Sequence, residues 1–381
     1  MKTLLQFIFA FLLLSPSIGK SQAISLFEAG KDGYSSYRIP SIIRTARGNL
    51  LAFCEARKDG AGDAGNIDIV MKRSGDGGKT WSKQIVIWDD GANTCGNPTP
   101  VLDEETGTVW LLLTHNLGSD HEKDIINKSS RGTRTVWATA SFNDGVSWSY
   151  PKEITSTTKK PSWGWYATGP GTGIQIKNGP RKGRLIIPCD FSYDDPNGKV
   201  ANGPYEYGSH IIYSDDHGRT WQLGGTITPK MNECQVVEVA DGNGTLLMNM
   251  RSYTGEGQRA QSFSYDGGIS WTAPKSIPDL VDPICQASFI RASWKDKNQK
   301  STLLFMNPAS PSIRHNMTVR ASFDEGKTWP VIRTVFPGPS AYSSITMLSD
   351  GNAGLLYEAG IKSPYESIRF EILSGSFLNV N

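Results

Sequence analysis

Three arginines, Arg38, Arg251 and Arg314, occur in polar segments far apart in this 381-residue sequence. The planar guanidinium group of arginine binds a carboxylate through paired, charge-assisted hydrogen bonds. Three such cations held close together repel one another unless an anionic ligand joins them. If the fold brings these side chains to one place, the sequence predicts a binding site for an anion, for which a carboxylate is well suited.

The elements that must position these arginines contain a repeated turn. The pattern Ser-x-Asp-x-Gly-x-Thr/Ser-Trp occurs five times, with Asn for Asp in the second copy, starting at Ser74, Ser141, Ser214, Ser264 and Ser322. Each copy follows an alternating run typical of a β-strand. The Asp can accept local backbone N–H bonds, the Gly supplies a positive φ and the Trp covers the loop, so the pattern predicts a hairpin turn. It indicates a fold and no particular chemistry.

A second repeat has a spacing of about 61 residues and six copies. Leucine-rich strands are predicted over residues 50–55, 110–115, 185–190, 246–251, 303–308 and 355–358. Each is preceded by another strand, at residues 38–44, 97–102, 171–176, 233–239, 285–291 and 342–348. With the strand before each turn, these repeats predict an all-β, six-bladed β-propeller of four-stranded antiparallel blades. The alternative is a sandwich with coincidental repeats.

In such a propeller the starts of the first strands and the ends of the second strands share one face. The five hairpin turns lie on the opposite face. The shared face should collect Arg38, Asn97, Glu233 and Tyr342 from strand starts, Glu55, Arg57, Asp190, Arg251 and Glu358 from strand ends, and Asp63 and Arg314 from the following loops. The alternative is that these are ordinary solvated or paired residues, because the mouth of any propeller is polar.

The chain resembles the exo-α-sialidases (neuraminidases) of the bacterial and animal six-bladed type over nearly all of its length after residue 23. The resemblance rests on the five Asp-box turns and on four segments: Tyr37-Arg38-Ile39-Pro40, the run from Asn232 to Glu238, Asn249-Met250-Arg251-Ser252 and Ala341-Tyr342-Ser343. Asp-box turns also occur in propellers without sialidase activity, so the specific part is the set of Arg, Glu and Tyr residues.

The resemblance implies a role for each site residue. Arg38, Arg251 and Arg314 would hold the carboxylate of sialic acid, with Arg320 as the alternative to Arg314. Tyr342 would be the nucleophile, Glu233 its base and Asp63, in preference to Asp59 or Asp68, the acid/base on the leaving oxygen. Arg57 and Asn97 would contact the sugar, and Glu358 would hold Arg38. Trp163, Trp165 and Tyr166 would either line a leaving-group or glycerol-side subsite or pack within a blade.

Charge explains the unusual nucleophile. The substrate carboxylate is attached to the anomeric carbon, so it would repel the carboxylate nucleophile of ordinary retaining glycosidases, and sialidases use tyrosine instead. A neutral phenol avoids this repulsion but is a weak nucleophile, because its ordinary pKa is near 10, and it therefore needs a base. We expect ligand binding to desolvate Asp63 and so to raise its pKa toward that of an acid.

Residues 1–23 are predicted to be an export signal, because Lys2 precedes a short apolar run that ends near Ser21-Gln22-Ala23. We expect residues 24–381 to form a single propeller domain that is exported to the periplasm or the medium. Without the signal, bases and acids balance, so no attraction to nucleic acid and no membrane insertion are expected. We expect a monomer that needs no metal or cofactor and whose five scattered cysteines are mostly buried thiols.

Together these features favour a retaining exo-α-sialidase that removes terminal sialic acids from sialylated glycans on glycoproteins, glycolipids and oligosaccharides. One alternative is a trans-sialidase, for which Trp163 or Trp165 could provide an acceptor platform. The other is a non-catalytic propeller that binds sialic acid. That second alternative predicts the loss of Tyr342, Glu233 or Asp63, and all three are present.

Overall fold

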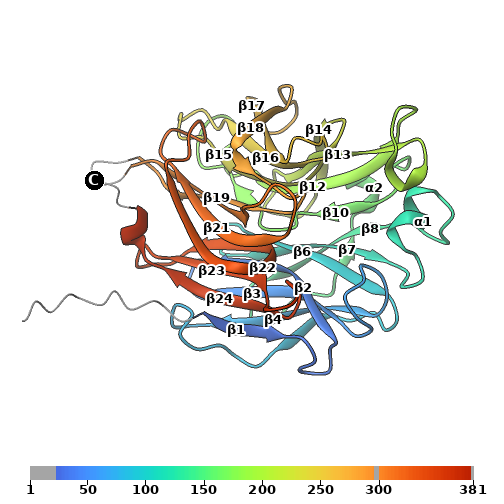
Figure 1. Cartoon of the computed structure of the whole chain (residues 1–381), viewed down its shortest axis with the longest axis horizontal. Coiled ribbons are helices and arrows are strands. Elements are labelled where there is room, and N and C mark those ends of the chain that lie inside the picture. Colours follow the sequence, from blue (N-terminus) through green and yellow to red (C-terminus); the bar gives the residue numbers. More distant parts are fainter. Residues whose placement is uncertain (1–22, 296–299, 379–381) are drawn as a thin grey trace, which may run out of the picture.

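The computed structural model describes residues 23–295 and 300–378, whose regular elements are almost entirely β-strands (Figure 1). Apart from Ala23, the predicted export signal lies outside the described residues. The strands form six antiparallel units that follow one another around the molecule in chain order, as the colours of Figure 1 show. The inner strands of neighbouring units are in contact, so the units are the six blades of a β-propeller, as predicted.

Each blade has four main strands, which follow one another from the centre of the propeller outward. Blade 1 contains β2 (Ser36–Arg44), β3 (Leu50–Arg57), β4 (Ile67–Ser74) and β5 (Ile85–Trp88). Blade 2 contains β6 (Thr94–Leu102), β7 (Val109–Asn116), β8 (Thr135–Ser141) and β9 (Lys152–Glu153). Blade 3 contains β10 (Tyr166–Thr168) with β11 (Ile174–Gln175), then β12 (Leu185–Asp194), β13 (Tyr205–Ser214) and β14 (Gln222–Ile227).

The second half of the chain repeats this order. Blade 4 contains β15 (Met231–Glu238), β16 (Leu246–Ser252), β17 (Gln258–Ser264) and β18 (Lys275–Val281). Blade 5 contains β19 (Ser288–Ser293), β20 (Thr302–Pro308), β21 (His315–Ser322) and the first part of β22 (Val331–Met347). The second part of β22 begins blade 6, which continues with β23 (Ala353–Ala359) and β24 (Ser367–Leu373). Short helices α1 (Glu122–Ile126), α2 (Thr155–Thr158), η1 (Val200–Asn202) and η2 (Gly375–Leu378) lie between or after strands.

The first strand of the described residues completes the last blade. β1 (Ile24–Glu28) pairs antiparallel with β24, so residues from the two ends of the domain share one sheet. This pairing joins blade 6 to the start of the chain and closes the ring.

The paired apolar residues of the second strands explain how the blades pack. Successive side chains of a strand point to opposite faces of its sheet. In β3, Leu50 belongs to the apolar cluster between blades 6 and 1, whereas Leu51 belongs to the cluster between blades 1 and 2. In β23, Leu355 and Leu356 divide in the same way between the clusters on either side of blade 6. Each blade therefore needs two adjacent large apolar residues, which is the repeat seen in the sequence.

The five predicted hairpin turns form after the third strands of blades 1–5. In the turn after β13, Asp216 Oδ1 accepts the backbone N–H of Thr220 at 2.9 Å, and Ser214 Oγ accepts that of Gly218 at 2.8 Å. Gly218 has φ +84°, a conformation that favours glycine. These contacts match the local bonding predicted from the pattern.

The innermost strand of blade 3 differs from the prediction. Instead of one strand over residues 171–176, two short strands, β10 and β11, flank the irregular residues 169–173. Gly169 and Gly171 have positive φ, and an intervening proline cannot donate to a strand ladder, so a continuous strand cannot form here. The side chains of Gln235 and Gln286 both donate to the carbonyl oxygen of Pro170. The segment is therefore held against residues of β15 and of the stretch before β19.

Candidate active site

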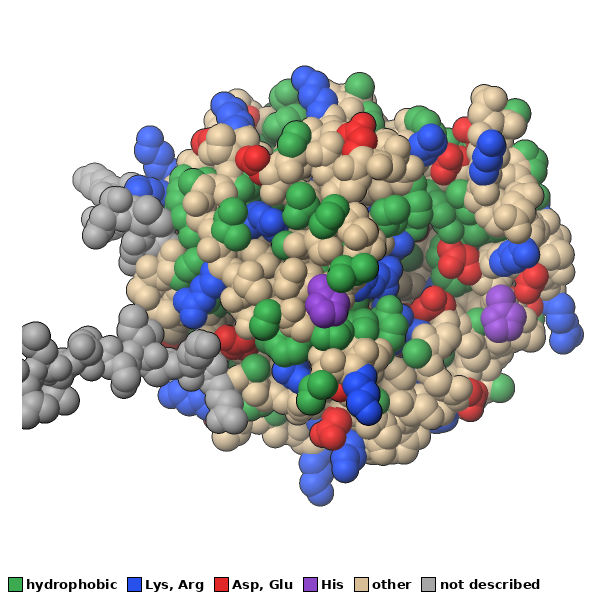
Figure 2. All heavy atoms as spheres, in the orientation of Figure 1, with side chains coloured by type: hydrophobic (Ala, Val, Ile, Leu, Met, Phe, Trp, Pro, Cys, Tyr) green, Lys and Arg blue, Asp and Glu red, His purple; other side chains and the backbone are tan. Residues whose placement is uncertain are grey.

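One cavity of about 370 Å³ lies where the innermost strands begin, at the end of the blades away from the hairpin turns. Figure 2 shows a hollow right of centre, near the loops around α1, where acidic and basic side chains gather. Eight of the nine predicted site residues line this site cavity: Arg38, Arg57, Asp63, Asn97, Glu233, Arg251, Arg314 and Tyr342. The ninth, Glu358, is completely buried behind them. The predicted convergence on one face is therefore present in the fold.

Tyr342 and Glu233 form the closest polar contact in the site cavity. β22 holds Tyr342 and β15 holds Glu233, and the Tyr342 hydroxyl donates to Glu233 Oε1 at 2.5 Å. Glu233 Oε2 accepts Arg251 Nη1 at 2.7 Å, and that nitrogen lies 3.4 Å from the Tyr342 hydroxyl. Burial and the neighbouring Glu233 carboxylate raise the pKa of Tyr342 well above its ordinary value. Tyr342 is therefore a neutral phenol whose proton points at a carboxylate.

The three predicted arginines surround this phenol. The guanidinium carbons of Arg38 and Arg314 lie 5.0 and 5.6 Å from the centre of the Tyr342 ring, and Arg251 contacts its hydroxyl. The Nη2 atoms of Arg38, Arg251 and Arg314 have no hydrogen-bond partner among the described residues. The site cavity can thus offer several unpaired N–H donors to one anion. The alternative cation Arg320 is buried elsewhere, where it donates to Asn307.

Glu358 connects two of these groups. Its Oε1 accepts Arg38 Nε at 2.8 Å and its Oε2 accepts the backbone N–H of Tyr342 at 3.1 Å. A buried carboxylate must be paired to be tolerated, and these contacts pair it. The contact to Arg38 was predicted, whereas the contact to Tyr342 was not.

Asp63 lies in the loop between β3 and β4, with 56% of its side chain exposed. Arg57 Nη1 forms an ion pair with Asp63 Oδ1 at 2.9 Å and also donates to the carbonyl oxygens of Ala61 and Gly62. The rest of the Arg57 guanidinium group binds Glu55. Arg57 therefore holds the Asp63 loop in place, and its contact with a sugar stays a prediction.

The electrostatics of Asp63 differ from the expectation for an acid. Partial desolvation raises its pKa, but the charges of Arg57 and Arg38 outweigh this effect and hold the pKa below the ordinary value. Without ligand, Asp63 is thus a carboxylate. The two alternative acids, Asp59 and Asp68, do not line the site cavity; Asp68 accepts the Tyr34 hydroxyl instead.

Hydrogen bonds to its backbone and its side chain hold Asn97 in place. Its φ is +52°, an uncommon conformation for asparagine, and its backbone N–H donates to Glu55 Oε1 at 2.8 Å. Its side-chain oxygen accepts Arg134 Nη2 and Thr114 Oγ1, at 2.8 and 2.9 Å. The Asn97 amide nitrogen has no partner among the residues described, so it remains a donor for a ligand.

Several residues of the site cavity were not predicted from the sequence: Glu122, Arg134, Tyr207, Tyr253 and Tyr365. Arg134 directly precedes β8, and Tyr207 lies near the start of β13; both are third strands. These strands begin on the same face as the first strands. A prediction that also considered the starts of the third strands would have included both residues. Of the three aromatic candidates, only Trp165 lines the site cavity, under the guanidinium group of Arg134 at 3.9 Å. Trp163 and Tyr166 pack in the core between blades 2 and 3.

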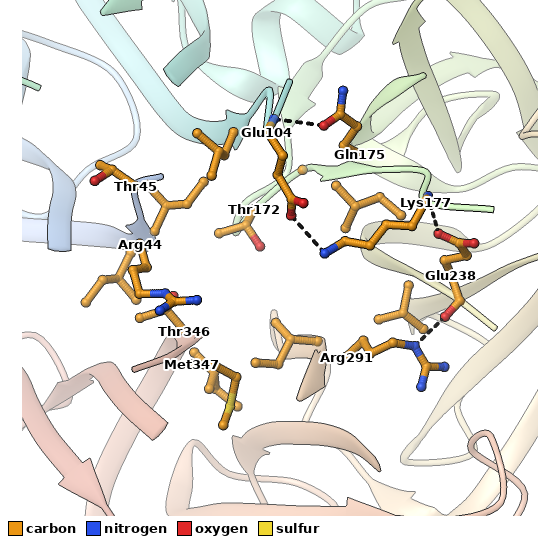
Figure 3. A pocket seen from close by; sticks show the side chains of 18 of the residues that line it. Arg44, Thr45, Glu104, Thr172, Gln175, Lys177, Glu238, Arg291, Thr346 and Met347 are labelled. Carbon is orange, nitrogen blue, oxygen red and sulfur yellow. Dashed lines mark hydrogen bonds and ion pairs between the residues drawn. The ribbon is translucent and has the colours of Figure 1, made fainter. Parts of the chain in front are cut away.

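A different hollow, of about 500 Å³, lies at the other end of the central channel (Figure 3). Its charged groups are largely paired within the chain. Lys177 Nζ binds Glu104 at 2.9 Å, and Arg291 binds the carboxylate of Glu325. Among the described residues that line it, Arg44 is the one cation without a partner. Among the described residues, this hollow therefore lacks the three guanidinium groups with free Nη2 atoms that line the site cavity.

Three further observations concern the cysteines, metal ligands and helices of the described residues. All five cysteines are free and buried, as expected. Within residues 23–295 and 300–378, no three His, Cys, Asp or Glu side chains are grouped as a metal site would require. No helix in the same part of the chain is long and apolar enough to cross a membrane.

Comparison with known proteins decides the family. Residues 48–355 match the family model of the BNR repeat-like domain. A sialidase of Micromonospora viridifaciens is 33% identical over 91% of this chain and 53% of its own length. A sialidase of Paraclostridium sordellii is 30% identical over 89% of this chain and 85% of its own length. The chain belongs to the sialidase family. This sialidase-family chain spans about half the length of the first of these relatives.

Solved structures agree with the assignment. The Hadza microbial sialidase Hz136 superposes with a TM-score of 0.80 at 31% identity, over 92% of this chain and 68% of that protein. The intramolecular trans-sialidase from Ruminococcus gnavus has a TM-score of 0.75 over 95% of this chain and 98% of its own, at 19% identity. The second likeness shows a shared fold only, because the sequences differ too much to compare their reactions.

Proposed function

We propose that this sialidase-family protein is a retaining exo-α-sialidase, which hydrolyses terminal α-linked sialic acids from glycoproteins, glycolipids and oligosaccharides. The observation that carries the proposal is the 2.5 Å contact between the Tyr342 hydroxyl and Glu233, inside a cavity that also holds Arg38, Arg251 and Arg314. A phenol paired with a carboxylate suits nucleophilic attack beside a negatively charged substrate group.

The three arginines would bind the substrate carboxylate. Their Nη2 atoms are free of partners among the described residues and surround the Tyr342 ring. A carboxylate bound there places the anomeric carbon, to which it is attached, next to the Tyr342 oxygen. Such fixed donors need no reorganisation during the reaction and so stabilise its charged states.

In the first step the Tyr342 oxygen bonds to the anomeric carbon while its proton passes to Glu233. The bond from that carbon to the leaving oxygen breaks, and Asp63, in its acid form, gives this oxygen a proton. In the second step water attacks the anomeric carbon and loses a proton to Asp63. The bond to Tyr342 breaks and Glu233 returns the proton, so two inversions give net retention.

Asp63 must gain a proton before the first step, although it is ionised in the free protein. The carboxylate of the substrate supplies a reason. Once Arg38 binds that carboxylate, it stabilises the charge of Asp63 less, and the bound sugar removes water from the loop; both changes raise the pKa of Asp63. Substrate binding thus favours the protonated form of Asp63, which the first step requires.

Transfer of the sialyl group to an acceptor sugar is the alternative outcome of the same intermediate. Product analysis with added lactose separates the two, because a hydrolase yields free sialic acid.

We further propose that the protein acts as an exported monomer, periplasmic or secreted, on the basis of the signal-like sequence of residues 1–23. Fractionation and gel filtration test these two points.

The proposed reaction is tested by release of a fluorogenic phenol from its α-sialoside. Wild-type protein should release it, and Tyr342→Phe should lose about 10²-fold or more of kcat, because the variant lacks the attacking oxygen. A Tyr213→Phe variant, on β13 of blade 3 and outside the site cavity, serves as the matched control and should keep full activity. Equal rates for wild type and Tyr342→Phe would contradict the proposed role of this residue.

A further inference from the structure

The hollow of about 500 Å³ in Figure 3 is built from the later residues of the first strands of all six blades. We name it the channel hollow. Each blade contributes a branched aliphatic side chain to its lining: Ile43, Leu102, Ile174, Val237, Ile290 and Ile345. No described residue lines both the channel hollow and the site cavity. The proposed reaction therefore does not use this space.

The rest of the fold covers the aliphatic lining only in part. Ile43, Leu102, Ile174 and Ile290 are partly exposed, although each also packs against an apolar cluster between blades. Met347, at the end of β22, is partly exposed in the same hollow. An apolar ligand that displaced water from these side chains would gain about 25 cal/mol for each Å² of apolar surface it covered. The volume of the channel hollow is within the usual range for small-molecule sites.

The acidic side chains of the channel hollow are already paired within the chain. Glu104 binds the ammonium group of Lys177 at 2.9 Å, and both oxygens of Glu238 accept backbone N–H groups. The charge of Arg291 is compensated in turn by Glu325. These contacts leave little acceptor capacity for a cationic ligand.

Arg44 has no such compensation. It is half-buried at the end of β2 and forms neither a hydrogen bond nor an ion pair with another described residue. Figure 3 shows its guanidinium group pointing toward the hollow. Thr346 lies on the neighbouring strand β22, which is joined to β2 by the Ile42 N–H donating to Ser344 Oγ at 3.1 Å. The hydroxyl groups of Thr346 and Thr172 also have no partner in the part of the chain that the structure describes, so the free polar groups suit an anion.

We propose that the channel hollow binds a small organic anion with an apolar body, such as a carboxylate attached to a hydrocarbon chain. Arg44 would bind the carboxylate through paired, charge-assisted hydrogen bonds, and the aliphatic side chains with Met347 would cover the hydrocarbon. Sialic acid suits this hollow less, because its hydroxyl groups would lie against side chains that cannot bond to them. The inference goes beyond the proposed function and does not depend on it.

The dye 8-anilinonaphthalene-1-sulfonate tests the inference, because it joins an anionic group to an apolar body and fluoresces on apolar surfaces. The folded protein should bind the dye, and decanoate should displace it at least tenfold better than decanol, which has the same chain length without the charge. In Arg44→Met the Kd of the dye should rise about ten- to a hundredfold, for the lost charge-assisted hydrogen bonds. Arg219→Met, exposed in the turn after β13, is the matched control and should bind the dye like wild type.

A second pair of variants locates the bound dye. Met347→Gln, which places a polar amide of similar length in the lining, should raise the Kd, whereas Tyr342→Phe in the site cavity should leave it unchanged. No binding by folded wild-type protein, equal displacement by decanoate and decanol, or an unchanged Kd in Arg44→Met would each overturn the inference. A Kd that rises in Tyr342→Phe would place the dye in the site cavity and overturn it as well. None of these measurements requires turnover of a sialoside, so this inference and the proposed function can fail separately.

Discussion

The buried carboxylate of Glu358 accepts the Nε of Arg38 at 2.8 Å, although 320 positions separate the two residues in the chain. The contact is possible because β1 closes the ring and places blade 6 beside blade 1. The same carboxylate accepts the backbone N–H of Tyr342. One side chain therefore sets the positions of an expected substrate-binding cation and of the expected nucleophile.

Glu358→Gln should weaken both the fold and the reaction. The amide would remove the nearest negative charge from the buried Arg38, so the free energy of unfolding should fall by about 3 kcal/mol. The KM for a sialoside should rise and kcat should fall, because Arg38 and Tyr342 both lose their anchor. Urea unfolding and steady-state kinetics measure these effects. Glu153→Gln, on the outer strand β9, is the control, and a Glu358→Gln variant that behaves like this control would contradict the assigned role.

Asp63→Ala should affect substrates according to their leaving group. With sialyllactose, whose leaving oxygen needs a proton, kcat should fall by about 10²- to 10⁴-fold. With a p-nitrophenyl or similar activated sialoside the first step needs little protonation, and the loss should be clearly smaller. Kinetics of the variant on both substrates check this. An equal loss on both would remove Asp63 from the role of acid.

His210 should make the fold sensitive to acid. It is completely buried among Trp163, Tyr166 and Phe191, and desolvation lowers its pKa to about 3. Because the unfolded chain binds this proton near pH 6.5, the unfolded state gains protons first as the pH falls. The stability contributed by neutral His210 is complete above pH 6.5 and is lost between pH 6.5 and 3, by about 3 kcal/mol at pH 4.

The measurement is urea unfolding of wild type and His210→Phe at pH 7 and pH 4. The variant cannot gain this proton, so its free energy of unfolding should fall less between the two pH values. A fall of the same size in both proteins would show that His210 does not titrate in this range.

Asp216→Ala should lower stability and leave the reaction intact. The variant loses the acceptor for Thr220 in the turn after β13, which should cost about 2 kcal/mol of unfolding free energy. The turn lies on the face away from the site cavity, so kcat and KM at a temperature where the variant is folded should match those of wild type. Reduced kcat in a fully folded Asp216→Ala protein would argue against this separation of roles.

Much of the fold could be predicted because each blade repeats a local pattern. The turns after β4, β8, β13, β17 and β21 depend on bonds within eight residues, and adjacent apolar pairs such as Leu355 and Leu356 indicate a sheet buried on both faces. Local sequence patterns do not predict the pairing of β1 with β24 or the break in the first strand of blade 3. Both depend on contacts between distant segments, such as those of Pro170 with Gln235 and Gln286.

Part of the site could be predicted because the repeated strand topology determines which residues share a face. Strand topology brings Arg38, Glu233 and Tyr342 to one face, whichever loops surround them. Glu122 lies in α1, between β7 and β8, and Tyr207 lies near the start of β13. The Tyr207 hydroxyl donates to Glu122 at 2.6 Å, a contact that depends on how the loops of blades 2 and 3 pack together. The charge state of Asp63 also depends on two arginines that only the folded chain brings near it.

The most direct test of the tyrosine nucleophile is to trap the intermediate. Attack of Tyr342 on 2,3-difluorosialic acid expels the fluoride at carbon 2, and the remaining fluorine slows the hydrolysis that follows. Mass spectrometry of peptides from the treated protein should find the added fluorosialyl mass on Tyr342. The added mass on Glu233 or Asp63, or turnover with inversion and no adduct, would contradict a covalent intermediate on Tyr342.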